Sequence, residues 1–155
     1  MFKKLISIFL IIVLTLSLFG CAVERIEEPN IDVNEPTLEE TSIKEDGIYT
    51  SPEEVAEYIH IYEKLPENYL TKKRAMELGW DNSKGNLWDV TDKGVIGGDK
   101  FGNREGLLPK EQGRQYFECD VNYEGGYGGG ERIVYSNDGL IFYTQDHYKS
   151  FKQLY

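Results

Sequence analysis

Cysteine and histidine are scarce in this chain of 155 residues, which contains two of each. The two cysteines, Cys21 and Cys119, are too few for a disulfide framework or a cysteine-based zinc site. The two histidines, His60 and His147, are the only side chains whose ordinary pKa lies near neutrality, at about 6.5. Acid–base chemistry that needs an imidazole must therefore use one of these two positions.

Positive charge is also in short supply, since 27 acidic residues face 17 basic ones. The imbalance is largest over residues 22–46, where nine acids stand against two basic residues, with two prolines and no aromatic residue. Such a segment buries too little apolar surface to offset its ordering entropy, so we expect residues 21–46 to form a disordered acidic tether. From Gly47 onward, 18 acids face 13 basic residues. This balance argues against non-specific affinity for nucleic acid.

Long apolar runs are lacking apart from Leu5 to Phe19, which follows two lysines. The run is shorter than the roughly 20 residues of a membrane-spanning helix and fits the apolar region of a secretory signal. It ends in Leu18-Phe19-Gly20-Cys21, which resembles the lipobox of bacterial lipoproteins, although Phe19 stands where a small residue is usual. We expect residues 1–20 to be a lipoprotein-type signal peptide and Cys21 to carry lipid outside the cell. An ordinary cleaved signal and an uncleaved anchor are the alternatives.

Local signals predict helices in the first part of the remaining chain. A capping box with proline at the first helical position, Ser51 to Glu54, begins a helix that ends near Lys64. Thr71 caps a second helix over residues 72–78, and one short helical turn is expected over residues 86–90. The first turn of the second helix is basic, which opposes the helix dipole and suggests a use for its cations.

The pattern changes to strands from Val95 onward. Asp138-Gly139 joins two β-rich runs and is a strong hairpin signal. Helices followed by consecutive strands indicate an α+β domain over residues 47–155, with N-terminal helices packed on an antiparallel sheet of about five strands. The predicted strands are residues 95–100, 115–123, 131–136, 140–144 and a terminal segment near 151–154.

The predicted strand from Tyr116 to Tyr123 has two chemically different faces, because successive side chains point to opposite sides of a sheet. Cys119 lies on the apolar face, where a small buried side chain is expected. Acids on the other face are by default solvated surface, and Asp120 keeps that interpretation. The apolar face consists of Phe117, Cys119, Val121 and Tyr123, and the polar face of Tyr116, Glu118, Asp120 and Asn122.

Glu118 acquires a candidate role through His147, which follows a predicted strand in a loop, a common place for catalytic groups. A carboxylate base and an imidazole acid are the pair needed to remove one proton and deliver another. Lys72 and Arg132 would complete such a site by stabilising negative charge in the transition state.

Six short motifs follow one another between residue 51 and the end of the chain: Lys64-Leu65-Pro66-Glu67-Asn68-Tyr69, Leu78-Gly79-Trp80, Ser83-Lys84-Gly85-Asn86-Leu87, Ile96-Gly97-Gly98-Asp99, Asn103-Arg104-Glu105-Gly106 and Asp146-His147-Tyr148. Together they resemble the barnase family of extracellular bacterial guanyl-specific ribonucleases. The resemblance excludes the leader and the tether.

The resemblance implies a metal-independent endoribonuclease that needs no cofactor and cleaves RNA after guanosine. Glu118 matches the general base that takes the proton of the ribose 2′-hydroxyl, and His147 matches the general acid that protonates the leaving 5′-oxygen. The product would be a 2′,3′-cyclic phosphate, which is then hydrolysed to a 3′-phosphate. Lys72 and Arg132 match cations that contact the phosphate.

The remaining matches are implied in the same way. Tyr148 matches a residue lining the phosphate site, and Asp99 a buried acid that supports the cations. The loop that begins at Phe101 matches the guanine pocket, in which the backbones of Asn103 and Arg104 read the base edge and the Glu105 carboxylate accepts hydrogen bonds from it. The partners implied by the resemblance are RNA and a barstar-like inhibitor protein, and we expect the enzyme itself to be monomeric. The membrane, bound through Cys21, is expected from the lipobox-like sequence instead.

One departure from the family pattern concerns the phosphate. Gly128, in a glycine-rich loop over residues 125–130, stands where relatives carry an arginine that contacts the reacting phosphate. Loss of one such donor typically costs on the order of 10²-fold in rate. An alternative hypothesis is therefore a weakened or inactive relative that binds RNA or protein. A secreted antibacterial toxin is a third, which a membrane tether fits poorly.

Overall fold

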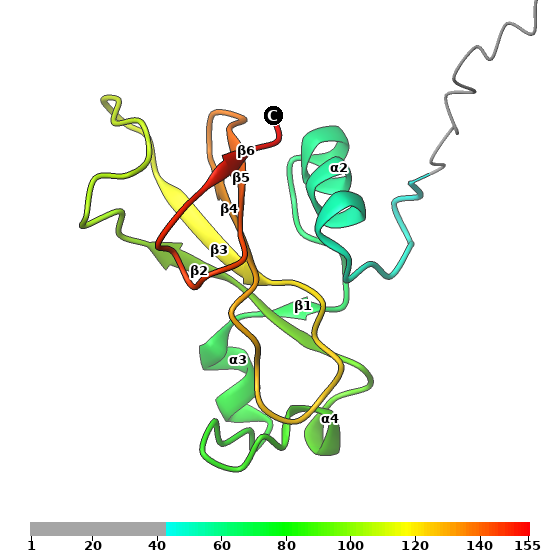
Figure 1. Cartoon of the computed structure of the whole chain (residues 1–155). Helices are drawn as coiled ribbons and strands as arrows, with labels where there is room; N and C mark the ends of the chain where they lie inside the picture. The colour runs from blue at the N-terminus through cyan, green and yellow to red at the C-terminus, as the bar shows by residue number, and fades with distance from the viewer. Residues whose placement is uncertain (1–42) are drawn as a thin grey trace, which may run out of the picture. The chain divides into compact units, whose positions relative to one another are not determined.

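The computed structural model describes residues 43–155, so the predicted signal peptide, Cys21 and most of the predicted tether lie outside the described part of the chain. The sheet has six strands in the order β1-β2-β3-β4-β5-β6. Helices lie beside it (Figure 1), which confirms the α+β class. The helices are α2 (Pro52–Tyr62), α3 (Lys72–Glu77) and α4 (Leu87–Val90). The strands are β1 (Tyr69–Leu70), β2 (Val95–Phe101), β3 (Tyr116–Asp120), β4 (Arg132–Ser136), β5 (Ile141–Thr144) and β6 (Lys152–Gln153).

Strands β2 to β6 pair antiparallel, as the sequence predicts. Strand β1 is additional and pairs parallel with β2, Tyr69 opposite Val95 and Leu70 opposite Ile96. The chain between these two strands contains α3 and α4, which provides the crossover that a parallel pair requires. A strand of two residues is too short to carry an alternating pattern, which is why it was not predicted. Over residues 43–155, no helix combines the length and apolar character needed to cross a bilayer.

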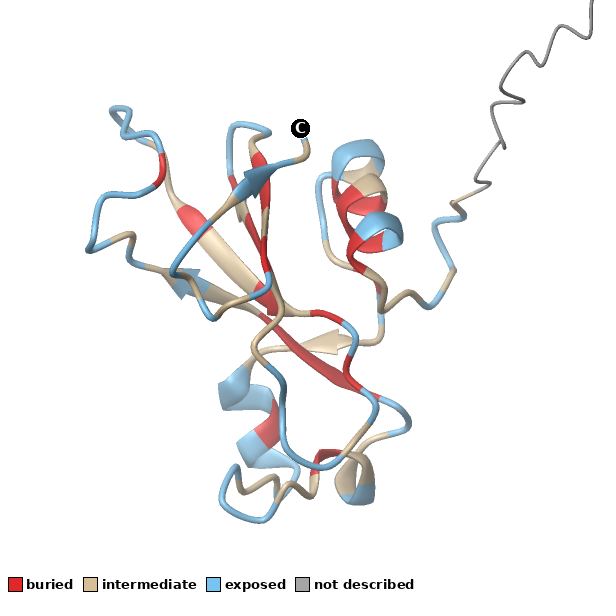
Figure 2. Ribbon diagram, viewed as in Figure 1, coloured by how far each residue is buried: buried red, intermediate tan, exposed pale blue. Residues whose placement is uncertain are grey.

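Helix α2 begins as predicted, because the Ser51 hydroxyl accepts a hydrogen bond from the backbone N–H of Glu54. It ends at Tyr62, slightly before the predicted end, since Glu63 adopts a left-handed φ of 55°. One side of α2 faces the sheet and is buried (Figure 2). The core between helix and sheet consists of Val55, Ala56, Ile59, Cys119, Val121, Ile133 and Ile141.

The last residues of the predicted tether belong to the folded domain, so the predicted boundary was wrong by several residues. The hydroxyls of Tyr58 and Tyr62 donate to the backbone carbonyls of Glu45 and Ile43, at 2.7 and 3.0 Å. The Lys64 ammonium also lies 2.7 Å from the Glu45 carboxylate. Composition misses these contacts because two of the three use the backbone, which every residue carries.

Strand β3 is covered on both faces. Cys119 is fully buried, as predicted, and burial raises the pKa of its thiol. Tyr116, expected on the exposed face, is only 5% exposed. The prediction was wrong for Tyr116 because the connection between β2 and β3 places Leu108 on this face. Tyr116 and Leu108 form a separate core cluster with Val134 and Phe142.

A β-bulge in β2 determines where Asp99 lies. The register between β2 and β3 shifts between Gly97 and Asp99, and Gly98 has a φ of 87°. Glycine adopts this left-handed conformation without the steric cost that other residues carry. After the bulge, Asp99 is paired with Glu118 of β3. The bulge therefore places the Asp99 carboxylate opposite Glu118, the predicted general base.

Candidate active site

The Glu118 carboxylate is held by two donors from different parts of the chain. Its Oε1 lies 2.7 Å from the Lys72 Nζ, and its Oε2 accepts a hydrogen bond of 2.6 Å from the Tyr148 hydroxyl. The Glu118 side chain is 14% exposed. Because each carboxylate oxygen has a donor at hydrogen-bonding distance, the Glu118 side chain is held in one orientation.

Lys72 is positioned by the start of α3. The Thr71 side chain caps the helix, as predicted, by accepting from the backbone N–H of Arg74. The first turn carries no acid, but Asp99 of β2 supplies one, since its Oδ2 accepts from the Lys72 backbone N–H at 2.8 Å. Burial lowers the pKa of Lys72, but the hydrogen bond to Glu118 and the negative charges of nearby acids together raise it by more, so the pKa lies above its ordinary value.

The supporting role that the family resemblance implies for Asp99 stays a prediction, although Asp99 holds the start of α3 through the Lys72 backbone N–H. Asp99 is half-buried where the resemblance implied a buried acid. Its contact with the first helical N–H satisfies a donor that has no partner within the helix. The negative charge also offsets the unfavourable dipole interaction of the basic first turn.

His147 and Tyr148 both adopt left-handed backbone conformations, with φ of 56° and 69°. Such conformations are uncommon for residues other than glycine and persist where the surroundings fix them. Here the His147 backbone N–H donates to the Gly130 carbonyl at 3.1 Å, and the Tyr148 N–H donates to the Thr144 hydroxyl at 3.0 Å. The loop after β5 is thereby tied to the glycine-rich loop before β4.

Asp146 organises the same loop and was not assigned a role from the sequence. Its carboxylate accepts from the Ser150 hydroxyl at 2.6 Å, from the backbone N–H groups of Lys149 and Ser150, and from the Thr144 hydroxyl. The bonds from Ser150 contribute most to lowering the pKa of Asp146 to about 2. The signal in the sequence was the clustering of hydroxyl residues around an acid, which is typical of side chains that bond to nearby backbone.

Tyr148 connects the predicted acid–base pair to the predicted base-binding loop. Burial raises the pKa of its hydroxyl, and the hydrogen bond to Glu118 raises it further, so Tyr148 stays a protonated donor. Its ring lies 5.1 Å from the ring of Phe101 and 4.8 Å from the His147 imidazole. The aromatic contact holds the end of β2 against the loop after β5.

The loop over residues 101–105 is closed by the Asn103 side chain. Its amide donates to the Leu108 carbonyl at 2.9 Å and accepts from the Leu108 N–H at 3.1 Å. Because the amide is engaged within the loop, Asn103 and Arg104 have only backbone groups and the Arg104 guanidinium to offer a ligand. Arg104 and Glu105 are exposed.

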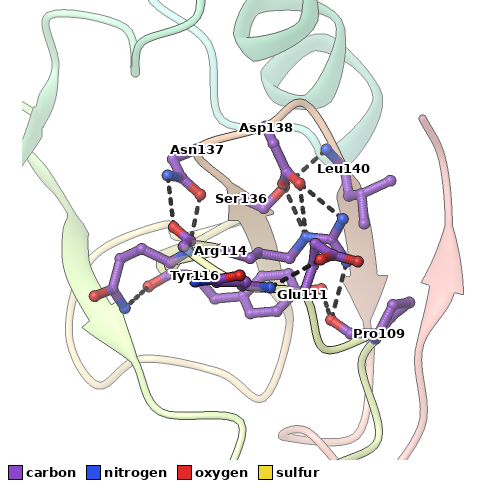
Figure 3. Close-up of polar contacts among 11 residues, drawn as sticks. Pro109, Glu111, Arg114, Tyr116, Ser136, Asn137, Asp138 and Leu140 are labelled. Carbon is purple, nitrogen blue, oxygen red and sulfur yellow. Dashed lines mark hydrogen bonds and ion pairs between the residues drawn. The ribbon is translucent and has the colours of Figure 1, made fainter.

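An ion pair anchors the far end of the connection that carries this loop (Figure 3). The Arg114 guanidinium lies 2.7 Å from the Asp138 carboxylate and also donates to the Pro109 carbonyl at 3.1 Å. The Tyr116 hydroxyl donates to the same carbonyl at 2.7 Å. The connection that contains residues 101–105 is thus fixed at one end by β2 and at the other by the turn between β4 and β5.

Arg132 and Asp120 form a cross-strand ion pair, Nε to Oδ1, at 2.8 Å. Their side chains are 12% and 17% exposed, so the expectation that Asp120 is solvated surface was wrong. Burial raises the pKa of Asp120, and the charge of Arg132 opposes that shift. Arg132 also donates to the Gly129 carbonyl at 2.9 Å. Part of its positive charge is therefore already balanced.

The predicted residues meet at two adjoining cavities that share His147 and Tyr148. A groove of about 850 Å³ is lined by the loop over residues 101–105 together with Glu118. A second cavity, of about 520 Å³, is lined by Lys72, Arg132 and several glycines. All four predicted catalytic residues and the predicted base-binding loop therefore face one continuous site, and Cys21 lies outside the described residues.

Comparisons with known proteins identify the family of the chain. The family model for ribonucleases matches residues 52–155. A ribonuclease of Heyndrickxia coagulans is 50% identical over 100 residues, which cover 64% of this chain and 92% of that protein. A ribonuclease of Bacillus intermedius is also 50% identical over 100 residues, 64% of this chain and 62% of that protein. The guanyl-specific ribonuclease St of Saccharopolyspora erythraea is 43% identical over 70 residues, 44% of this chain and 65% of that protein. The chain belongs to the ribonuclease family, as its spaced motifs predicted.

Proposed function

We propose that this ribonuclease is an endoribonuclease that cleaves RNA on the 3′ side of guanosine, through a 2′,3′-cyclic phosphate. One observation carries the proposal: Glu118 and His147 line the same groove as the loop over residues 101–105. A carboxylate and an imidazole are the two groups that an in-line displacement needs as base and acid. The loop supplies a binding site for the nucleobase of the nucleotide whose ribose reacts.

The guanine base enters the groove against the loop. RNA enzymes read an unstacked base by hydrogen bonds to its edge. The exposed Glu105 carboxylate accepts from the nitrogen donors of guanine, while the backbones of Asn103 and Arg104 bond to the rest of that edge. Adenine lacks the N1–H donor and the amino group at position 2, so Glu105 favours guanine.

The chemistry then proceeds in two steps. Glu118 takes the proton of the 2′-hydroxyl as this oxygen attacks the adjacent phosphorus, and His147 delivers a proton to the 5′-oxygen as the phosphorus–oxygen bond breaks. In the second step the roles are exchanged: His147 takes a proton from water, the water oxygen attacks the cyclic phosphate, and Glu118 returns a proton to the 2′-oxygen. The first nucleophile is already attached beside the phosphorus, so its positioning needs no metal.

Lys72 and Arg132 stabilise the negative charge that develops on the phosphate oxygens. Gly128 adds no charge, and Arg132 is shared with Asp120 at 2.8 Å. We therefore expect a lower rate than a site with three free cations would give. We do not favour the alternative of a binding module, because the candidate general base, the candidate general acid and the Lys72 cation line the two adjoining cavities.

The test is cleavage of the dinucleotide guanylyl-3′,5′-cytidine (GpC) in excess chelator, with adenylyl-3′,5′-cytidine (ApC) as the control. Chromatography should find guanosine 2′,3′-cyclic phosphate and free cytidine first, and guanosine 3′-phosphate later. ApC should be cleaved more slowly. Lack of a cyclic phosphate at high enzyme concentration would overturn the proposal.

We also propose that the protein is held outside the cell by lipid on Cys21, which the lipobox-like sequence before it supports. An RNA substrate follows from the ribonuclease family. From the family resemblance we also expect a barstar-like inhibitor and a monomeric enzyme. An inhibitor of that kind would have to cover the two cavities around His147.

A further inference from the structure

The cavity beside Arg132 extends beyond the groups that the proposed reaction uses. Its lining includes the apolar and aromatic side chains of Met76, Trp80 and Tyr123. Gly126 and the glycines at positions 128–130 also line it. Glycines project no side chain into the cavity, and a volume of about 520 Å³ leaves room for a planar ring.

The two cavities follow the direction of an RNA strand. Glu118, which acts on the 2′-hydroxyl, lines the groove that contains the loop over residues 101–105. His147, which protonates the leaving oxygen, lines both the groove and the cavity. The leaving oxygen belongs to the nucleotide on the 3′ side, so this nucleotide lies beyond His147, where the cavity is.

Asp120 gives the cavity a chemical preference. Its ion pair with Arg132 uses Oδ1, whereas its Oδ2 faces Gly128, because a β-carbon added to Gly128 would lie 3.2 Å from it. Among residues 43–155, Arg132 is the one ion-pair partner of this carboxylate. A carboxylate has about four acceptor sites, so Asp120 can accept further hydrogen bonds. A negative acceptor in the cavity wall favours a ligand group that donates a hydrogen bond.

We propose that this cavity binds the base of the nucleotide on the 3′ side of the scissile phosphate, and that Asp120 selects bases with an exocyclic amino group. The proposal rests on the proposed ribonuclease reaction. Cytosine carries an amino donor at ring position 4, where uracil carries a carbonyl acceptor that the carboxylate repels. The ring packs against Trp80, since bases stack readily on aromatic side chains.

The glycine at position 128 is essential to this preference. Any longer side chain at Gly128 would project toward Asp120 Oδ2 and occupy the space of the base. A basic side chain would in addition take up the acceptor capacity of Asp120. With glycine in place of the family arginine, the site loses a phosphate contact and gains a contact to the nucleobase.

The test compares two substrate pairs that differ only in the pyrimidine. The uncleavable 2′-deoxy analogues of GpC and guanylyl-3′,5′-uridine (GpU) report binding by calorimetry on the full chain, and the ribonucleotides report kcat/KM. We expect the cytosine form to bind about 10-fold more tightly, as one hydrogen bond to a charged group gives, and to be cleaved faster by a similar factor. Equal binding of the two analogues would overturn the inference. If the cytosine analogue bound 10-fold more tightly but neither ribonucleotide was cleaved, the inference would be supported and the proposed reaction would be overturned.

Two variants assign the ratio to this cavity. Asp120→Asn places an amide that both donates and accepts, so the cytosine-to-uracil ratio should fall to about 1 even if the overall rate drops. Gly128→Leu should lower the ratio by filling the space beside Oδ2. Glu124→Gln is the matched control, because Glu124 is an exposed acid of the same loop, and its ratio should stay at the parent value. A ratio that persists in both Asp120→Asn and Gly128→Leu would overturn the assignment.

Discussion

The Lys72 ammonium and the Glu118 carboxylate lie 2.7 Å apart, although 46 positions separate them in the chain. Lys72 comes from the first turn of the short helix α3 and Glu118 from β3, a central strand of the sheet. The contact places a positive charge beside the general base of the proposed reaction. In that reaction we expect Lys72 also to contact a phosphate oxygen.

Removal of Lys72 should therefore slow the reaction strongly. We expect Lys72→Ala to lower kcat/KM for GpC by on the order of 10²-fold, the usual loss for one stabilising donor. Lys73→Ala is the control, since Lys73 is the adjacent exposed lysine on the same helix, and its effect should stay below about threefold. Steady-state kinetics at one fixed salt concentration makes the comparison, and similar losses in the two variants would contradict a specific role for Lys72.

Restoring a cation at position 128 should have two opposite effects. Gly128→Arg is expected to raise kcat/KM for GpC by up to roughly 10²-fold, because it adds a donor for the phosphate. The same variant should lose the preference for cytosine over uracil, since the new side chain occupies the space beside Asp120. Tyr127→Arg adds the same charge at the exposed neighbouring position and serves as the control. An unchanged rate in Gly128→Arg would mean that the loop no longer directs this position at the phosphate.

Glu105 should account for much of the preference for guanosine. A bidentate contact to a base edge provides about 1–3 kcal/mol of discrimination. We expect Glu105→Gln to lower the GpC-to-ApC ratio of kcat/KM by roughly 10- to 100-fold. Glu111→Gln alters an exposed acid further along the same connection and should keep the parent ratio. If Glu105→Gln slowed both substrates equally, Glu105 would serve the fold of the loop and not the choice of base.

Asp146 should make the stability of the domain depend on acid pH. Its pKa is lowered from 3.8 to about 2, chiefly by the hydrogen bonds from Ser150. A group with a lowered pKa stabilises the fold fully above its unfolded value and loses that effect as the pH falls through its folded value. Asp146→Asn should therefore unfold at a lower temperature than the parent at pH 6, and the two melting temperatures should converge between pH 4 and pH 2. Circular dichroism measures both, and a constant difference across this range would refute the assignment.

The predicted anchor can be tested on the protein made by its own cells. Mass spectrometry of the mature amino terminus should find acylated Cys21. Cys21→Ala should remove the lipid and release the protein from the membrane fraction. A mature terminus at Ala22, or an intact Met1, would contradict the lipoprotein prediction and favour one of the two alternative signals.

Local sequence patterns predicted the elements because their causes are local. The caps at Ser51 and Thr71 act within one helical turn, and the predicted starts of α2 and α3 are those of the structure. The Asp138-Gly139 turn likewise separates β4 from β5, as predicted. Each of these features depends on side chains fewer than five residues apart.

The errors concern contacts across the fold. The burial of Tyr116 depends on Leu108, which reaches it from the long connection between β2 and β3. The ion pair of Asp120 with Arg132 depends on the register of β3 and β4. A tight turn would have fixed that register in advance, but eleven residues join the two strands. Alternation in β3 could therefore place Asp120 on a face, but could not identify its partner.

The sequence identified candidate residues of the site but not the contacts between them. His147 and Glu118 were singled out by residue type and by family motifs. The hydrogen bond from Tyr148 to Glu118 and the support that Asp146 gives to the loop were not. Both depend on how the loop after β5 folds back, and the periodicity of apolar residues in the sequence does not predict loop conformation.

The left-handed backbone at His147 has a consequence for the evolution of the protein. A residue other than glycine in this conformation is destabilised by about 1–2 kcal/mol, and glycine would occupy the same backbone without that cost. Glycine at position 147, however, would lack the imidazole that the proposed reaction uses. The fold and the chemistry thus prefer different amino acids at one position, and selection for thermal stability alone would be expected to discard the histidine.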